Sequence, residues 1–494
     1  MLSDNEKSVG VSGFGMYLPR FRVSLEDWCG WTGNPWEKVG TTVGHGFRVA
    51  GPDEDVYTMA ATAVLRLILA HDVDPRSVGF LALGTESSSD NSAGAIIVKG
   101  MVDKALEQMG RPRIPRQCEV PELKHACLGG VYALKAGLRY LLCDGRGRRA
   151  IAVSSDIAEY ERGSSGEPTQ GACAVAQLLE EDPKLYSIDL RETGSAAAYR
   201  AVDFRKPRKR LLRPGSDRGG RARLPDYPVI NGHYSTICYT DQSLHAVARL
   251  LHKLGLDPRS LHHLVDAWFL HRPYHRMPIN VMAALYVWGL ARDAEGRVEL
   301  ETLCRDAGAD FDEMLAEAYS SPDLFTDAPG GGIDGGAYPQ ATKVVKHFRD
   351  TPKFEEVVSQ KMCLGMAGAK EIGNVYTASL PAWIAAGMDD ALERGVDLTG
   401  KIAFTLGYGS GDAAEAMLIR FTPRWRDAAQ RSGFKEAFAG AIDLKREEYE
   451  ALHDGFAAPC PASAPSGRFG VERTGDTDGP DFQDLGIDYY RYFP

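Results

Sequence analysis

Residues 56–87 read VYTMAATAVLRLILAHDVDPRSVGFLALGTES, and they indicate the fold class. Residues 56–70 form a long, mostly apolar run that is typical of a helix, whereas residues 78–87 form a short β-rich apolar run that predicts a strand. Because helix and strand follow one another directly, this stretch predicts a layered α/β fold.

The same alternation of helical and strand-like runs continues on both sides of this stretch. Strands are predicted at 9–18, 149–158, 171–179, 263–271 and 401–411, and a further helix at 131–142. In both halves of the chain the strands end in polar loops, as a pseudo-duplicated fold would have them. We therefore expect a layered fold built from two similar halves.

Composition places the chain among ordinary proteins with a large core. It has 494 residues, of which 44% are hydrophobic and 25% charged, and a formal net charge of -10. This charge gives no reason to expect binding to nucleic acid or to an anionic membrane. The beginning of the chain lacks the pattern of a secretory signal, and no run of eighteen apolar residues follows, so a cytoplasmic location is expected.

The nine cysteines are scattered without metal-ligand spacing. An odd number without CxxC pairs argues against a disulfide framework and against a structural zinc site. Most of these cysteines are therefore expected to be buried thiols.

We predict four segments along the chain: an N-terminal half at 1–200, a basic excursion at 201–234, a C-terminal half at 235–455 and a mobile tail at 456–494. The excursion contains RKPRKRLLRPGSDRGGRAR at 205–223, which predicts either a solvated loop or a surface that faces phosphates. The tail is rich in Pro, Ser, Gly and Asp at 457–482, but its aromatic end, DYYRYFP, is expected to dock onto the body.

Cys127 is the first candidate for chemistry. It stands in PELKHACLGGVYALKAGLRYLL, residues 121–142, just before two glycines and an amphipathic helix. The positive end of the helix dipole favours a thiolate there, and the following backbone N–H groups are placed to hold an oxyanion. The pattern alone is also compatible with an ordinary buried cysteine.

Glu86 and His271 are the next candidates, and each follows an apolar strand. A half-buried carboxylate has a raised pKa and can serve as general acid and base, although a capping or surface glutamate is the simpler interpretation. A histidine can bind a thioester carbonyl or accept a proton, or be purely structural. Pro273 lies between His271 and His275, which disfavours a helical metal pair.

Two polar stretches complete the set of candidates. Asn374 lies in EIGNVYTASL at the beginning of a predicted helix, and Ser410 lies between glycines in FTLGYGSGDA. The stretch GYGSG lacks both the GxSxG spacing of a nucleophile elbow and the lysine of a phosphate-binding loop. Ser410 is therefore predicted to form a tight turn beside a site.

Taken in order, these motifs resemble the hydroxymethylglutaryl-CoA synthase family, a branch of the thiolase superfamily. The stretches that carry the resemblance are GTESSSDNS, KHACLGG, AVSSDIAEYERGSSGEPTQGACAVA, VDFRKP, DYPVINGHYS, LHRPYHRM, GNVYTASL and GYGSG, and they extend from about Val9 to about Arg420. Each is weak alone, but the ordered set is specific. The resemblance implies an αβαβα thiolase-like fold with two pseudo-duplicated halves.

The resemblance also implies a reaction, the condensation of acetyl-CoA with acetoacetyl-CoA to 3-hydroxy-3-methylglutaryl-CoA in the mevalonate pathway of isoprenoid biosynthesis. Cys127 would carry the acetyl group, Glu86 would serve as acid and base, and His271 would orient the acceptor. The residues implied to line the acyl and pantetheine tunnel are Tyr160, Thr169, Ser235, Asn374 and Ser410. Neither a metal nor a cofactor is implied, and a homodimer is expected.

The sequence departs from the family pattern near His271. His275 and Arg276 stand where the family usually has a small residue or cysteine and then a lysine, and Asn280 takes the place of a further lysine. The stretches 101–116 and 208–223 are longer than the family leads us to expect. Contacts to phosphates and the mouth of the tunnel are therefore expected to differ.

Three other functions compete with this one. A β-branching synthase of polyketide assembly would use the same residues on groups carried by an acyl-carrier protein, for which the basic excursion is a candidate docking surface. A decarboxylating ketoacyl synthase needs no general base, so Glu86 argues against it. A scaffold subunit is expected to have lost the nucleophile, whereas Cys127, Glu86 and His271 are all present.

Overall fold

The structure is a computed structural model, and it describes residues 8–494 except 89, 201–202, 204, 207–226, 230, 322–323, 325–336, 456–465 and the side chain of residue 233. Most of the predicted basic excursion lies outside the described residues. In the described part of the chain, no helix is both long and apolar enough to cross a membrane.

One mixed sheet of ten strands runs through the molecule in the order β10-β11-β12-β8-β1-β7-β6-β4-β5, with β9 on β12. Its first part comprises β1 (Val9–Tyr17), β4 (Val78–Gly84), β5 (Glu122–Leu123), β6 (Arg149–Ala158) and β7 (Gly171–Glu181). Its second part comprises β9 (Thr193–Ala197), β10 (Ala267–Leu270), β11 (Ile402–Gly409) and β12 (Ala413–Phe421). The short strand β8 (Tyr186–Ser187) bonds to both β1 and β12 and joins the two parts.

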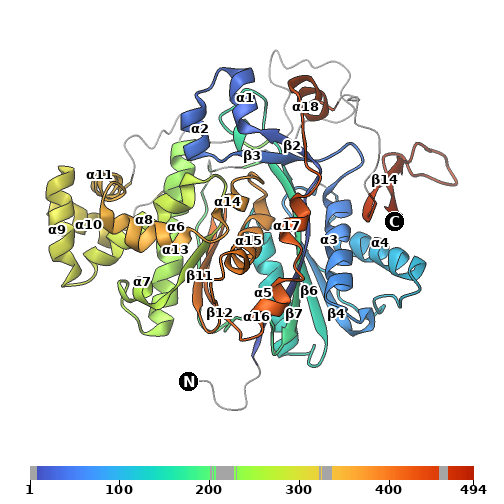
Figure 1. Cartoon of the computed structure of the whole chain (residues 1–494), viewed down its shortest axis with the longest axis horizontal. Helices are drawn as coiled ribbons and strands as arrows, with labels where there is room; N and C mark the ends of the chain where they lie inside the picture. Colours follow the sequence, from blue (N-terminus) through green and yellow to red (C-terminus); the bar gives the residue numbers. More distant parts are fainter. Residues whose placement is uncertain are drawn as a thin grey trace.

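The four main helices are α3 (Val56–Ala70), α5 (Gly129–Leu142), α6 (Gly232–Leu254) and α15 (Ser379–Glu393). Figure 1 shows them in a five-layer arrangement, with α6 on one outer side, α5 and α15 in the middle and α3 on the other outer side. In β4, Phe80 and Ala82 pack into the core of the central layer, whereas Leu81 and Leu83 pack with α3. This confirms the predicted αβαβα fold.

The two parts of the sheet repeat one plan. The chain order β1-α3-β4-α5-β6-β7 recurs as β9-α6-β10-α15-β11-β12, with antiparallel and parallel pairs at matching places. A Cβ atom on Gly15 would lie 2.3 Å from the Ala63 oxygen of α3, and one on Gly194 would lie 2.0 Å from the Ala246 oxygen of α6. Both outer helices therefore approach their strand closely because glycine stands there. Since β9 belongs to the second unit, the division falls between β8 and β9 and not at residue 200.

Smaller elements surround this body. A three-stranded sheet, formed by β2 (Phe21–Ser24), β3 (Gly46–Val49) and β13 (Ile442–Asp443), lies with α1 (Leu25–Thr32), α2 (Trp36–Thr42) and α18 (Arg446–His453) at the top of Figure 1. A helical extension beside α6 contains α8 (Arg276–Ala291), α9 (Gly296–Ala307), α10 (Phe311–Tyr319) and α11 (Pro339–Phe348). The other helices are α4 (Gly94–Gln108), α7 (Ser260–Leu264), α12 (Pro352–Phe354), α13 (Gln360–Met362), α14 (Met366–Ala369), α16 (Trp425–Ala429) and α17 (Phe434–Phe438).

The end of the chain forms a hairpin of β14 (Arg468–Thr474) and β15 (Asp488–Phe493). Phe469 is buried against α3, its backbone N–H donates to Thr62 Oγ1 at 3.0 Å, and Tyr490 donates to Asp55 Oδ2 at 3.1 Å. The predicted docking of the aromatic end is thus confirmed. The mobility predicted for residues 456–494 stays a prediction, although Phe469 and Tyr490 attach this hairpin to α3 and its N-cap.

Candidate active site

The candidate residues meet where the two halves of the fold face one another. Glu86 follows β4 and Cys127 precedes α5. In the second half His271 follows β10 and Asn374 precedes α15, so these two occupy the corresponding places. Because the fold is duplicated, the ends of β4 and β10 and the beginnings of α5 and α15 each place one of these four polar side chains in the same region.

Cys127 and Glu86 are in direct contact. The Cys127 thiol donates to Glu86 Oε2 at 3.2 Å, and Ala126, with a φ of 43°, turns the chain at this point. Burial, together with the nearby Asp156, raises the pKa of Glu86 to about 7. Burial and the Glu86 carboxylate raise the pKa of the Cys127 thiol well above its ordinary value. The pair therefore rests as a thiol beside a carboxyl group that titrates near neutral pH.

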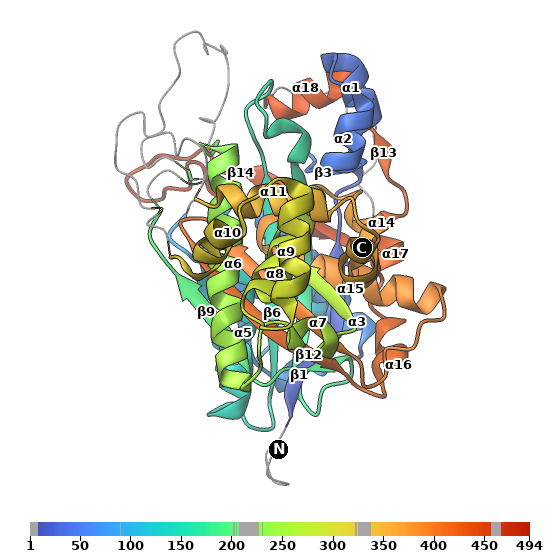
Figure 2. The ribbon, with the colours of Figure 1, turned by 90° about the vertical axis from the view of Figure 1, so that its left-hand side faces the viewer.

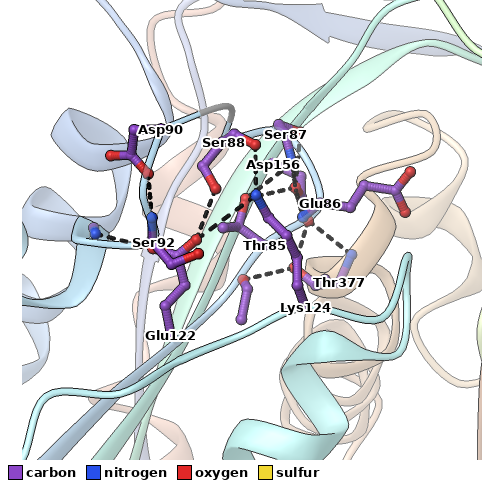
Figure 3. Close-up of polar contacts among 12 residues, drawn as sticks. Thr85, Glu86, Ser87, Ser88, Asp90, Ser92, Glu122, Lys124, Asp156 and Thr377 are labelled. Carbon is purple, nitrogen blue, oxygen red and sulfur yellow. Dashed lines mark hydrogen bonds and ion pairs between the residues drawn. The ribbon is translucent and has the colours of Figure 1, made fainter. Parts of the chain in front are cut away.

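Asp156, which the sequence did not single out, fixes the backbone at Glu86. Its Oδ1 accepts from the Glu86 N–H at 2.8 Å, the Ser87 N–H at 3.0 Å and the Thr85 hydroxyl at 2.9 Å, while Oδ2 accepts from the Thr377 N–H at 2.9 Å. Figure 3 shows the Glu86 side chain pointing away from this network. Asp156 thus holds the loop through its backbone and leaves the Glu86 carboxyl available to Cys127.

We expect Asp156→Asn to lower both stability and turnover. Both carboxylate oxygens of Asp156 accept hydrogen bonds. In either orientation of the asparagine amide, its NH₂ group would therefore face N–H or hydroxyl donors and could not accept from them. Loss of these buried bonds should cost about 2–4 kcal/mol of unfolding free energy and, by releasing Glu86, about 10²-fold in kcat. Urea unfolding and steady-state assays measure both effects, with the exposed Asp427→Asn as control. An unchanged kcat would contradict a positioning role for Asp156.

A cavity of about 310 Å³ extends from Cys127 and collects the remaining predicted residues. Besides Cys127 and His271, it is lined by Tyr160, Thr169, Ser235, Asn374 and Ser410. It is also lined by residues that sequence reasoning missed, among them Thr42, Val43, Pro273, Tyr274, Met277 and Tyr408. The sequence analysis assigned none of these residues a chemical role, and they line the cavity with a mixture of apolar groups and hydroxyls. Such a lining suits a long, narrow thioester.

Within the cavity, Asn374 is held from two sides. Its backbone N–H donates to the Thr169 carbonyl at 2.8 Å, and its Nδ2 donates to the Tyr160 hydroxyl at 3.1 Å. Burial raises the pKa of Tyr160, so this hydroxyl stays protonated at neutral pH. Asn374, Thr169 and Tyr160 therefore form one linked polar wall.

His271 is buried and uncharged. Burial, and then the adjacent Arg272, lower the pKa of His271 to about 3. Its backbone carbonyl accepts a hydrogen bond from Tyr239 at 2.7 Å, and the Tyr239 ring packs against Tyr408. A neutral imidazole with a fixed backbone can hydrogen-bond a carbonyl group without bringing a charge into the cavity.

No group of three or more His, Cys, Asp or Glu side chains is arranged to hold a metal ion in the described ranges. A thiol and an imidazole that line one cavity, together with a carboxyl group in contact with the thiol on a duplicated αβαβα fold, define an acyl-condensing enzyme of the thiolase superfamily.

Comparisons with known proteins narrow this class. The family described as "Hydroxymethylglutaryl-coenzyme A synthase N terminal" matches residues 5–184. The hydroxymethylglutaryl-CoA synthase of Gibberella zeae is 30% identical over 447 residues, 85% of this chain and 83% of that protein. The hydroxymethylglutaryl coenzyme A synthase of Fusarium sp is 33% identical over 418 residues, with 80% and 78% covered. The chain belongs to the hydroxymethylglutaryl-CoA synthase family, which confirms the resemblance found in the sequence.

Solved structures agree on the fold. "MvaS in complex with 3-hydroxy-3-methylglutaryl coenzyme A" has a TM-score of 0.74 at 24% identity and covers 99% of this chain and 100% of that one. The curacin-pathway HMG synthase in complex with holo donor-ACP has a TM-score of 0.69 at 18% identity, with 99% and 100% covered. At these sequence identities, the structural match supports the fold alone.

Proposed function

We propose that the protein condenses acetyl-CoA with acetoacetyl-CoA to 3-hydroxy-3-methylglutaryl-CoA and CoA through an acetyl-Cys127 intermediate. The observation that carries this proposal is the 3.2 Å contact between the Cys127 sulfur and Glu86 Oε2 at the end of a cavity that His271 also lines. A nucleophile and an acid–base group are thereby within reach of one small acyl group.

The first step is acetyl transfer. The Cys127 sulfur attacks the acetyl carbonyl carbon, the bond from that carbon to the CoA sulfur breaks, and CoA leaves with the proton that Cys127 gives up. Cys127 stands just before α5, so the positive end of this helix dipole lies beside the developing oxyanion.

The second step forms the carbon–carbon bond. The Glu86 carboxylate removes a proton from the methyl group of acetyl-Cys127, and the resulting carbanion attacks the ketone carbon of acetoacetyl-CoA. His271, neutral at this pH, donates a hydrogen bond to the ketone oxygen, and Glu86 returns its proton to the new alcohol. Water then hydrolyses the bond to Cys127, which releases the carboxylic acid product and restores the thiol.

The most informative assay asks whether the enzyme uses acyl groups bound to CoA or acyl groups bound to a carrier protein. The MvaS structure contains a CoA thioester, whereas the curacin synthase structure contains a donor carrier protein. We propose CoA for both substrates here, with a carrier protein as the alternative. Product formation from the two CoA thioesters should exceed that from the same groups on a carrier protein. No product from CoA thioesters together with turnover on the carrier would favour the polyketide role.

The remaining expectations belong to the same proposal. We propose a cytoplasmic homodimer of the mevalonate route that needs no metal and no cofactor beyond its thioester substrates. Light scattering at assay concentration tests the dimer, and assays in excess EDTA test the independence from metals. Loss of turnover in EDTA that added divalent metal restores would contradict this part of the proposal.

The pH dependence of condensation should follow Glu86. Because its pKa is raised to about 7, only about a tenth of this carboxyl is ionised at pH 6, and the base form predominates above pH 8. The condensation rate of pre-acetylated enzyme should therefore fall about tenfold per pH unit below 7 and level off above it. Single-turnover kinetics with acetoacetyl-CoA measure this profile. A midpoint near the ordinary glutamate value would show that another group limits the step.

A further inference from the structure

A second cavity, of about 340 Å³, lies outside the active site among the helices α6, α8, α10 and α11. Figure 2 shows these four helices on the face turned to the viewer. None of the predicted catalytic or tunnel residues lines it, and Thr236 of α6 is the residue that it shares with the active cavity. The reaction proposed above leaves this space without a role.

The long middle of the second cavity is apolar. Apolar side chains from all four helices face it: Leu244 from α6, Ala284 and Val287 from α8, Met314 from α10 and Val345 from α11. Two acidic residues also line it, but both have partners: Asp241 accepts from Arg200 at 2.7 Å, and Glu317 accepts from two backbone N–H groups at the beginning of α11. The middle therefore suits a hydrocarbon chain.

Cations line the cavity at two places: Arg292 follows α8, where its guanidinium packs over Trp288 and Tyr319, and two further cations lie beside Asn280. Thr236 and Asn280 lie near the beginnings of α6 and α8, and Lys346 and Arg349 come from the end of α11. Arg349 donates to Asn280 Oδ1 at 2.5 Å, and neither Lys346 nor Arg349 forms an ion pair with any residue that the structure describes.

The charges nearby indicate the kind of head group. Burial, and then the positive charge of the neighbouring Arg276, lower the pKa of Arg349, whereas the charge of Asp350 raises it. Arg276 is therefore a third cation, close to Arg349. A few positive charges partly offset by one acid fit a singly charged carboxylate better than a doubly charged phosphate. The apolar middle and the cationic end lie in one continuous cavity.

We propose that this cavity binds an aliphatic carboxylate of medium chain length, with the carboxylate at Lys346 and Arg349 and the chain between α6 and α8. The ligand would act as an effector of the enzyme, because both helices also bound the active cavity: α6 through Ser235 and Thr236, and α8 through Met277. Occupancy fixes the separation of these helices and is expected to change KM for the acceptor more than kcat.

Calorimetric titration of the full chain with decanoate tests the proposal. The titration is made with saturating CoA present, so that the active cavity is occupied. We expect decanoate to bind, 1-decanol to bind at least about tenfold more weakly, and acetate not to bind at about 1 mM. Equal binding of decanol and decanoate would overturn the recognition of the head group, and no binding of decanoate at about 1 mM would overturn the site.

Three variants locate the binding. The double variant Lys346→Gln with Arg349→Gln should weaken decanoate about tenfold or more, whereas Lys343→Gln, on the exposed side of the same helix and outside the cavity, should not. Ala284→Phe fills the apolar middle and should abolish binding while leaving the active cavity in place. If Ala284→Phe does not fold, the exposed Lys346→Gln alone decides the question. Unchanged affinity in the charge variants would refute the proposed site.

Because these binding experiments do not depend on turnover, their failure is distinct from a failure of the proposed condensation. The effect on the enzyme is measured separately, as KM for acetoacetyl-CoA with and without decanoate. A shift in KM that the Lys346 and Arg349 variants remove, and that Lys343→Gln keeps, is the expected result. A shift that persists in these variants would mean that decanoate acts at another place.

Discussion

Replacing Cys127 with alanine is expected to abolish acetyl transfer and to lower kcat by about 10⁴-fold or more. The covalent intermediate needs the sulfur atom of Cys127 in the cavity, and the methyl group of alanine offers no nucleophile in its place. Mass spectrometry of protein mixed with labelled acetyl-CoA should show one acetyl group on the native chain and none on Cys127→Ala.

The control for this experiment is Cys143→Ala, since Cys143 is an exposed free thiol away from the cavity. This variant should acetylate and turn over like the native protein. Stoichiometric acetylation of Cys127→Ala would move the nucleophile to another residue and would remove the main support for the proposed reaction.

Replacing Glu86 with glutamine should separate the two half-reactions. An amide cannot take a proton from the acetyl methyl group, so condensation should slow by about 10³-fold or more. Acetylation should survive, because the Glu86 carboxylate is one of the causes that raise the pKa of Cys127, and removing its charge eases formation of the thiolate. The variant is therefore expected to accumulate acetyl-Cys127 when only acetyl-CoA is present.

Two measurements check this prediction. Mass spectrometry follows the acetyl-enzyme, and product formation after addition of acetoacetyl-CoA follows condensation. The exposed Glu107→Gln on α4 serves as control and should do both at native rates. Native condensation by Glu86→Gln would exclude Glu86 as the base, and loss of acetylation in that variant would mean that Glu86 also activates the thiol.

Much of this architecture was accessible from local patterns. Apolar runs of strand and helix character predicted the duplicated layered fold, and reactive residues at the ends of these runs predicted the site. Cys127, His271 and Asn374 share one cavity in the structure, and Glu86 touches Cys127. Their chemical roles remain predictions that the variants above will test.

Other features had no local signal. Asp156 looked like one polar residue among several in SSDIAEY, and only the fold brings it under Glu86 and Thr377. Asn280 looked like the loss of a family lysine, yet Arg349, 69 residues further along the chain, reaches it. Contacts of this kind depend on how elements far apart in the sequence pack together, so local sequence patterns do not predict them.

The sequence by itself determined the order of strands and helices and the chemical identity of the thiol, carboxyl and imidazole, because side-chain periodicity and residue type are local properties. Only the tertiary structure decided that Cys127 and Glu86 touch, that the pKa of Glu86 is raised to about 7 and that His271 is neutral. The physical reason is that pKa values depend on burial and on neighbouring charges, and both arise only when the two halves of the chain close around one cavity.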